Sequence, residues 1–140
     1  MTKPSFSARK KARRFALQAL YSWMMSDNDL RDIEIHFLTE HSDVKFDIEY
    51  FRLLLHEIPP RITELENNLN PFLDRSVEDL DPIELTILRM AVYELLFRLD
   101  IPYRVVINEA LELAKTFGAV DSYKFVNGVL DKIAKKVRKD

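Results

Sequence analysis

The sequence contains no cysteine and only two glycines among its 140 residues. Without cysteine, neither a disulfide nor a thiolate metal site can form, and a reducing cytoplasm is the expected location. Two glycines are too few for a phosphate-cradling loop, and their scarcity disfavours a sheet joined by tight turns. Because 47% of the residues are hydrophobic and 31% are charged, the composition predicts a single all-α domain with its own core.

Long apolar runs are also missing. No stretch approaches the roughly 18 residues that span a bilayer, and residues 1–26 lack the apolar segment of a secretory signal. Residues 1–26 contain arginine and no acidic residue, which makes their composition similar to that of a mitochondrial transit peptide. The helical spacing of Leu20 and Trp23, however, favours a role for this segment in a folded core. We therefore expect no membrane contact, and an amphipathic helix lying on a membrane surface is disfavoured for the same reason.

Acidic residues are absent from the first part of the chain. Residues 1–26 carry six basic and no acidic side chains, residues 27–131 carry ten basic and 22 acidic ones, and residues 132–140 carry five basic and one acidic. A positive patch on an acidic body selects where a polyanion can dock. The division of charge therefore predicts a nucleic-acid partner for the basic part.

Catalytic motifs are missing as well. The chain has three histidines and no HExxH, GxSxG, GxGxxG or Walker-type loop, so we expect no enzyme, no cofactor and no metal site. His36 and Glu40 could share a helix face as metal ligands, but two ligands without a third are far more often a solvated pair. Glu109 and Glu112 could be paired acids, but beside Lys115 they are typical of a charged helix face.

What the sequence does contain is helical periodicity. Apolar residues recur at helical spacing in residues 8–24, 30–38, 48–58, 62–73, 82–97, 102–117 and from about 121 to 137, which predicts about seven helices. Asp81, Pro82 and Glu84 have the spacing of an N-cap, a first helical position and a capping box. The helix that follows is apolar around most of its circumference and is predicted to be the central buried one. The stretch NPFLDRSVEDLDP could separate two halves, at about residues 1–75 and 76–140.

Both glycines fall at helical positions. Gly118 follows the apolar stripe that ends at Phe117 and is expected to be a C-cap. The pair Asn127 and Gly128 is typical of a hairpin turn, but Val126 and Val129 continue the helical spacing across it. Gly128 is therefore expected inside a helix, at a cost of about 1 kcal/mol relative to Ala that a close approach by another backbone would offset.

The first helix is predicted to have two faces. One faces the core and carries Ala12, Ala16, Ala19, Leu20 and Trp23, with Phe15, Leu17 and Met24 at its margins. The other is an outward stripe of Lys10, Arg14, Gln18 and Tyr21. The alternative to a binding role is that this stripe is simply a helix face exposed to solvent. Two observations argue against it. Cations in the first turns of a helix oppose its macrodipole, and Gln18 and Tyr21 add groups that can hydrogen-bond to bases or stack on them.

A second candidate surface lies in FGAVDSYKF. Phe125 lies about 100° from the centre of the last apolar stripe and is next to Lys124, so an aromatic ring and a cation adjoin. Asp121 and Ser122 begin the helix, where amide groups are available to phosphate or base edges. Marginal core packing of Phe125 and simple N-capping by Asp121 remain open.

Four stretches carry a family resemblance: ARKKARRFALQALYSW, YFRLLLHEI, LRMAVYELLFR and IPYRVVINEALELAKTFGAVDSYKFVNGVLDKIA. Together they resemble the bacterial transcription antitermination factors of the NusB family. The resemblance implies an all-helical fold of two small packed bundles without catalysis. It also implies a heterodimer with the small-subunit ribosomal protein NusE, binding to single-stranded boxA RNA of ribosomal RNA leaders, and a place in the antitermination complex of RNA polymerase.

The resemblance also assigns roles to residues. It implies phosphate contacts from Arg9, Lys10, Lys11, Arg13 and Arg14, and base contacts and stacking from Phe117, Asp121, Ser122, Lys124 and Phe125. It puts Tyr21 and Glu84 at the NusE interface, which replaces the RNA role of Tyr21 and is compatible with capping by Glu84. Gln18 keeps its RNA role from the stripe, and we expect the two surfaces to form one trough for an unpaired strand.

Two alternatives remain open at this point. The chain could be an RNA-binding accessory domain of the kind found in RNA methyltransferases, although no S-adenosylmethionine-binding glycine loop follows. It could also be a protein-interaction module that docks an acidic partner and never contacts RNA. The sequence leaves open whether the free protein forms a homodimer.

Overall fold

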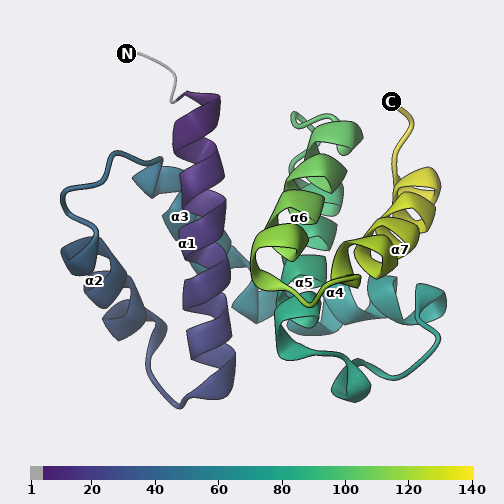
Figure 1. Cartoon of the computed structure of the whole chain (residues 1–140), viewed down its shortest axis with the longest axis horizontal. Helices are drawn as coiled ribbons and strands as arrows, with labels where there is room; N and C mark the ends of the chain where they lie inside the picture. Colours follow the sequence, from purple (N-terminus) through teal and green to yellow (C-terminus); the bar gives the residue numbers. More distant parts are fainter. Residues whose placement is uncertain (1–4) are drawn as a thin grey trace. The chain divides into compact units, whose positions relative to one another are not determined.

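A computed structural model describes residues 5–140, and residues 1–4, including Lys3 of the basic opening segment, lie outside the described part. The described residues form seven α-helices and three short 3-10 helices, with no strand among them (Figure 1). The α-helices are α1 (Phe6–Met25), α2 (Leu30–Glu40), α3 (Ile48–Glu57), α4 (Ile62–Leu69), α5 (Pro82–Phe97), α6 (Tyr103–Phe117) and α7 (Ser122–Val137). The predicted all-α class is confirmed.

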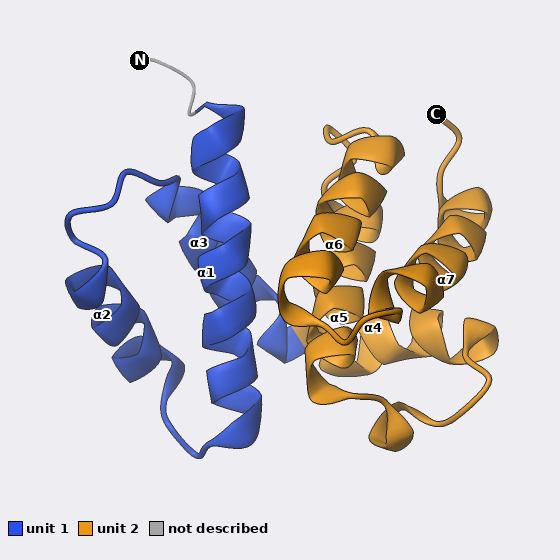
Figure 2. Cartoon of the chain, in the orientation of Figure 1, with its two compact units in different colours: residues 1–60 blue, residues 61–140 orange. Residues whose placement is uncertain are grey.

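The chain divides into two compact units, residues 1–60 and residues 61–140 (Figure 2). The sequence placed the boundary near residue 75, after α4 rather than before it. The structure differs because Leu65 and Leu69 of α4 are buried and α4 packs against α5. After α4, a short 3-10 helix (Asn70–Phe72) carries Pro71, where the α-helix cannot continue.

In the first unit, α1 packs against both α2 and α3. Ala12, Ala16, Ala19 and Leu20 are buried as predicted, and small side chains allow the helices to approach closely. Leu17 is also fully buried rather than marginal, because two helices cover α1 and widen its apolar face. Trp23, in the last turns of α1, is only partly buried.

In the second unit, α5 packs against α4, α6 and α7, and its middle is buried on all sides. This confirms the predicted central helix. Asp81 is its N-cap, and the carboxylate accepts hydrogen bonds from the amides of Ile83 at 2.8 Å and Glu84 at 3.2 Å. Apolar as α5 is, none of the helices in residues 5–140 is both long and apolar enough to cross a membrane.

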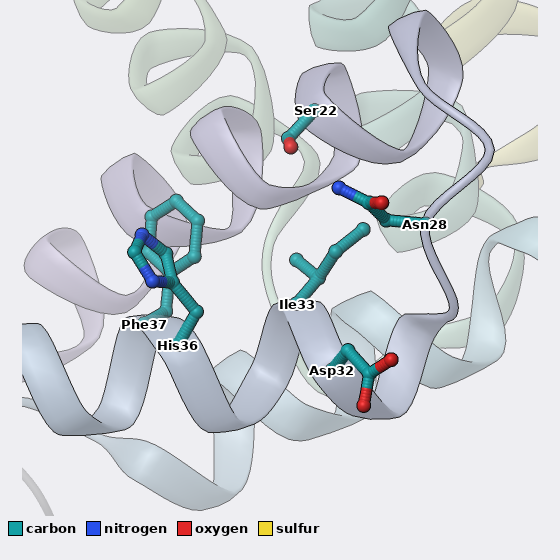
Figure 3. Close-up of a pocket in the computed structure, with 6 residues that line it drawn as sticks. All are labelled: Ser22, Asn28, Asp32, Ile33, His36 and Phe37. Atoms are coloured by element: carbon teal, nitrogen blue, oxygen red, sulfur yellow. The ribbon is translucent and has the colours of Figure 1, made fainter.

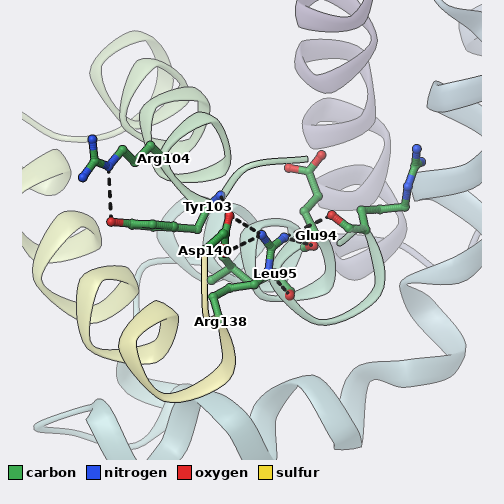
Figure 4. A network of polar contacts seen from close by, with 7 residues as sticks. Glu94, Leu95, Tyr103, Arg104, Arg138 and Asp140 are labelled. Atoms are coloured by element: carbon green, nitrogen blue, oxygen red, sulfur yellow. Dashed lines mark hydrogen bonds and ion pairs between the residues drawn. The ribbon is translucent and has the colours of Figure 1, made fainter. Parts of the chain in front are cut away.

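The C-terminal tail closes the second unit through a buried arginine (Figure 4). The Arg138 side chain is 5% exposed and donates hydrogen bonds to three carbonyls at the end of α5. These are the carbonyls of Glu94 at 3.3 Å, Leu95 at 2.8 Å and Arg98 at 3.0 Å. Asp140 accepts a bond from the Tyr103 amide at 3.2 Å, and this bond lowers the pKa of Asp140. The tail therefore joins the end of α5 to the start of α6.

The two glycines have different surroundings. Gly128 lies inside α7 as predicted, but the expected close approach of another backbone is wrong: Gly128 is exposed, and a Cβ built on it meets nothing within 4 Å. Gly118 is the C-cap of α6 as predicted, with φ −89° and no left-handed backbone. A Cβ there would lie 2.7 Å from the Ala114 carbonyl oxygen and 2.9 Å from Ser122 Cβ. Glycine is needed at 118 for space rather than for conformational freedom.

Gly118→Ala is therefore expected to lower the free energy of unfolding by about 1–3 kcal/mol, because the turn before α7 must shift to make room. Urea denaturation followed by circular dichroism measures the change. Gly128→Ala is the matched control, since the same methyl group is added where there is space. It is expected to raise stability by about 1 kcal/mol. An equal gain at both positions would contradict the steric explanation for Gly118.

Candidate nucleic-acid interface

Three cations of α1 and one neutral amide side chain form a surface that we call the α1 basic surface: Lys10, Lys11, Arg14 and Gln18. Lys11, Arg14 and Gln18 are exposed and Lys10 is partly exposed. The Lys10 ammonium lies 5.9 Å from the centre of the Phe6 ring. Ser5 begins the helix and accepts a hydrogen bond from the Ala8 amide at 3.0 Å. The cap fixes the first turn, from which this surface extends along the helix.

Arg9 and Arg13 face α3 instead. Arg13 is 2% exposed, and its guanidinium carbon lies 5.3 Å from the centre of the Tyr50 ring. Because Arg13 is buried, the predicted contact between Arg13 and an RNA phosphate is wrong. At helical spacing, Arg13 lies on the same buried face as Leu17 and Leu20. Arg9 lies at the edge, with its side chain 30% exposed and Nε 3.6 Å from a carboxylate oxygen of Asp47.

The start of α7 presents the second candidate surface. Asp121 and Lys124 are exposed and form an ion pair at 3.4 Å. Asp121 occupies the N-cap position, but its side chain makes no capping hydrogen bond. Phe117 and Phe125 are partly exposed. We call Phe117, Asp121, Lys124 and Phe125 the α7 block; it offers two ring surfaces, one cation and one carboxylate.

The predicted RNA contact of Ser122 is wrong, because Ser122 is buried and makes a hydrogen bond within the protein. It is 4% exposed, and its hydroxyl donates a hydrogen bond to the carboxylate of Glu84. Its amide donates to the Ala119 carbonyl at 3.0 Å, so this amide is also engaged. The reason is packing, because the first turn of α7 lies against the first turn of α5, and sequence spacing cannot report such a contact. Glu84 itself stays partly exposed, as does Tyr21.

Arg75 lies at this surface, although nothing in the sequence indicates it. Its guanidinium carbon lies 5.0 Å from the centre of the Phe125 ring, a cation–π distance. Arg75 also bonds to the neighbouring Asp74 at 3.0 Å, and this hydrogen bond lowers the pKa of Asp74. No periodicity or motif links Arg75 to Phe125, because the two residues come from separate segments that only the fold brings together.

A cavity of about 350 Å³ lies elsewhere in the first unit, between α2 and the end of α1 (Figure 3). Its lining residues are Ser22, Asn28, Asp32, Ile33, His36 and Phe37. None of these belongs to either candidate surface. His36 is exposed, with Nε2 3.4 Å from a carboxylate oxygen of Glu40, and residues 5–140 contain no group of three side chains suited to a metal ion.

The exposed cations of α1, and the partly exposed rings beside Lys124 in the α7 block, are features of nucleic-acid-binding proteins, here on an all-α fold. The comparison with known families makes the class specific. The NusB family model matches residues 10–135, and the chain belongs to the NusB family of transcription antitermination factors, which are not enzymes.

Individual relatives match over nearly the whole chain. The transcription antitermination protein NusB of Colwellia psychrerythraea is 53% identical over 132 residues, which is 94% of this chain and 96% of that protein. A structure of NusB from T. maritima is similar with a TM-score of 0.82 and 33% identity, covering 99% of this chain and 96% of that one. A crystal structure of antitermination factors NusB and NusE in complex with double-stranded RNA has a TM-score of 0.84 and 28% identity, covering 94% and 99%.

Proposed function

We propose that this protein binds single-stranded boxA-type RNA of ribosomal RNA leaders as a heterodimer with NusE, and thereby acts in the cytoplasmic antitermination complex of RNA polymerase. The observation that carries the proposal is the α1 basic surface. Lys10, Lys11 and Arg14 lie in the second and third turns of α1, and no acidic side chain on this helix offsets their charge. Such a concentration of one sign of charge favours a polyanionic partner.

In this proposal the two surfaces have different tasks. The α1 basic surface supplies attraction to phosphates that does not depend on sequence. The α7 block reads unstacked bases, with Phe125 as a stacking platform and Lys124 and Asp121 as hydrogen-bonding groups. Arg75, which lies over the Phe125 ring, adds a guanidinium plane beside that platform. The expected trough joining both surfaces stays a prediction.

NusE is proposed to contact Tyr21 and Glu84. Both side chains are partly exposed, and the bond from Ser122 holds Glu84 in position from inside. Size-exclusion chromatography of the free chain, and of an equimolar mixture with NusE, tests for a homodimer and for the heterodimer. Tyr21→Asp is expected to reduce heterodimer formation, because it puts a charge in place of an aromatic contact.

The proposal is tested by binding to three labelled RNAs of equal length: a boxA-type single strand, a scrambled single strand, and the boxA sequence as a duplex. Each is titrated with and without NusE. We expect the boxA single strand to bind most tightly, with a slope of log K against log salt of about −3 to −4 for four to six phosphates. Preference for the duplex would contradict the single-strand proposal. Heterodimer formation without RNA binding would favour a protein-interaction module.

Phe125→Ala is expected to weaken binding of the boxA single strand by about 1–3 kcal/mol, because a stacked base loses its platform. In a titration at fixed salt this is an increase in Kd of about 5- to 150-fold. Phe125→Tyr keeps the ring and is expected to bind like the unchanged protein. Phe97→Ala removes a phenyl ring at an exposed position outside the proposed surfaces and serves as the control. Equal losses for Phe125→Ala and Phe97→Ala would contradict a stacking role.

A further inference from the structure

Gly128 has no explanation inside the chain. A helix interior favours nearly every residue over glycine, and Gly128 lies in the middle of α7. It is exposed, and an added Cβ would meet nothing within 4 Å. Neither a backbone conformation nor internal packing therefore requires glycine at this position. A remaining reason for a bare backbone is the close approach of something outside the chain.

The neighbours of Gly128 indicate what approaches. Lys124 and Phe125 of the α7 block lie one turn before it, and Lys132 lies one turn after it on the same face. Lys135 and Lys136 continue this face, and all three of these later lysines are exposed. Lys135 pairs with Asp131 at 3.2 Å, and the Lys136 ammonium lies 5.8 Å from the centre of the Phe72 ring.

Local helix energetics explains part of this pattern. Lys135 and Lys136 stand in the last turn of α7, where cations are favoured by the macrodipole. Neither the helix end nor any packing contact explains Gly128. The residues one turn before and after Gly128 are Lys124, Phe125 and Lys132. Their positive charge is complementary to a polyanion, and they are continuous with the α7 block, to which Lys124 and Phe125 belong.

We propose that the bound RNA continues from the α7 block along this face of α7, with its sugar–phosphate backbone against Gly128 and with Lys132 on the next phosphate. The missing side chain lets the strand lie close to the helix, and Lys135 and Lys136 extend the positive charge beyond it. This inference rests on the proposed function, because it assumes that the α7 block binds RNA. It adds a second stretch of contact, at residues to which the family resemblance assigned no role.

The test uses variants of Gly128 that are expected to raise the stability of the protein and at the same time to weaken its binding of RNA. Gly128→Ala and Gly128→Gln both replace glycine with a better helix former, so the melting temperature is expected to rise by about 3–5 °C. The boxA single strand is expected to bind about threefold more weakly to Gly128→Ala and about tenfold more weakly to Gly128→Gln, as the side chain grows. Asn108→Gln, at an exposed position of α6, is the control that should leave the Kd unchanged.

A salt titration gives an independent measure. Lys132→Gln is expected to make the slope of log K against log salt shallower by about 0.7, the contribution of one single-strand phosphate. Arg31→Gln, exposed on α2, removes the same charge and should keep the slope. If the unchanged protein binds RNA and the Gly128 variants bind equally well, the path along α7 is wrong while the proposed function stands. If the unchanged protein binds no RNA with NusE present, the proposed function itself fails.

Discussion

Replacing Lys10, Lys11 and Arg14 together with Gln is expected to make the slope of log K against log salt shallower by about 2, because each single-strand phosphate contact contributes about 0.7. The total slope would change from about −3 to −4 to about −1 to −2, and binding at 0.1 M salt would weaken about 100-fold. These three cations belong to the α1 basic surface, whose attraction to phosphates does not depend on sequence, so the loss should appear for boxA and scrambled RNA alike. Titrations at four or five salt concentrations measure it.

Two controls sharpen this test. A triple variant with Gln at Arg31, Lys45 and Arg104 removes the same charge from exposed positions outside the proposed surfaces, and it should keep the slope. Arg13→Gln removes a buried guanidinium, so it is expected to lower the melting temperature while leaving the slope unchanged. A slope that responds to Arg13→Gln as strongly as to one exposed cation would show that Arg13 contacts RNA phosphates and would contradict its burial.

Arg138→Met is expected to lower the free energy of unfolding by about 3 kcal/mol, and the melting temperature by about 10 °C. The reason is that one buried guanidinium donates to three carbonyls at the end of α5. Methionine fills similar space but leaves those acceptors without their charged donor. Urea denaturation of the full chain measures the change.

Arg138→Lys separates charge from geometry. Lysine keeps the positive charge but lacks the planar fork, so it is expected to recover only about half of the loss. Lys139→Met, at the exposed neighbouring position, should change stability by less than about 0.5 kcal/mol. A loss below about 1 kcal/mol for Arg138→Met would indicate that water replaces the guanidinium once the tail moves away.

Local patterns predicted the helices because the interactions that form them are local. The spacing of apolar residues located all seven α-helices, and Asp81 with Pro82 marked the start of α5 to the residue. Ambiguity between a hairpin and a helix at Gly128 was resolved by the same spacing. The boundary between units was placed after α4 instead of before it, since whether α4 packs on α5 depends on contacts between distant segments.

The exposure of the site residues was predicted correctly only where it depends on position along a helix and not on contacts with distant segments. Lys11, Arg14, Gln18, Asp121 and Lys124 are exposed as a helical pattern suggests. Arg13 and Ser122 are buried because α3 covers one and α5 covers the other. Residues 132–140 carry five basic side chains, and of these Arg138 turns inward to the carbonyls of α5. Residue type and spacing give no information on which neighbour will cover a side chain.

The sequence by itself determined that this is an all-α protein without catalytic motifs, with a basic first helix and the motifs of the NusB family. These properties depend on composition and on interactions within a few residues along the chain. Only the tertiary structure decided which cations remain accessible, which ring Arg75 covers, why Gly118 is small and that Gly128 is bare. Each of these depends on contacts between segments far apart in sequence, and such contacts exist only once the chain has folded.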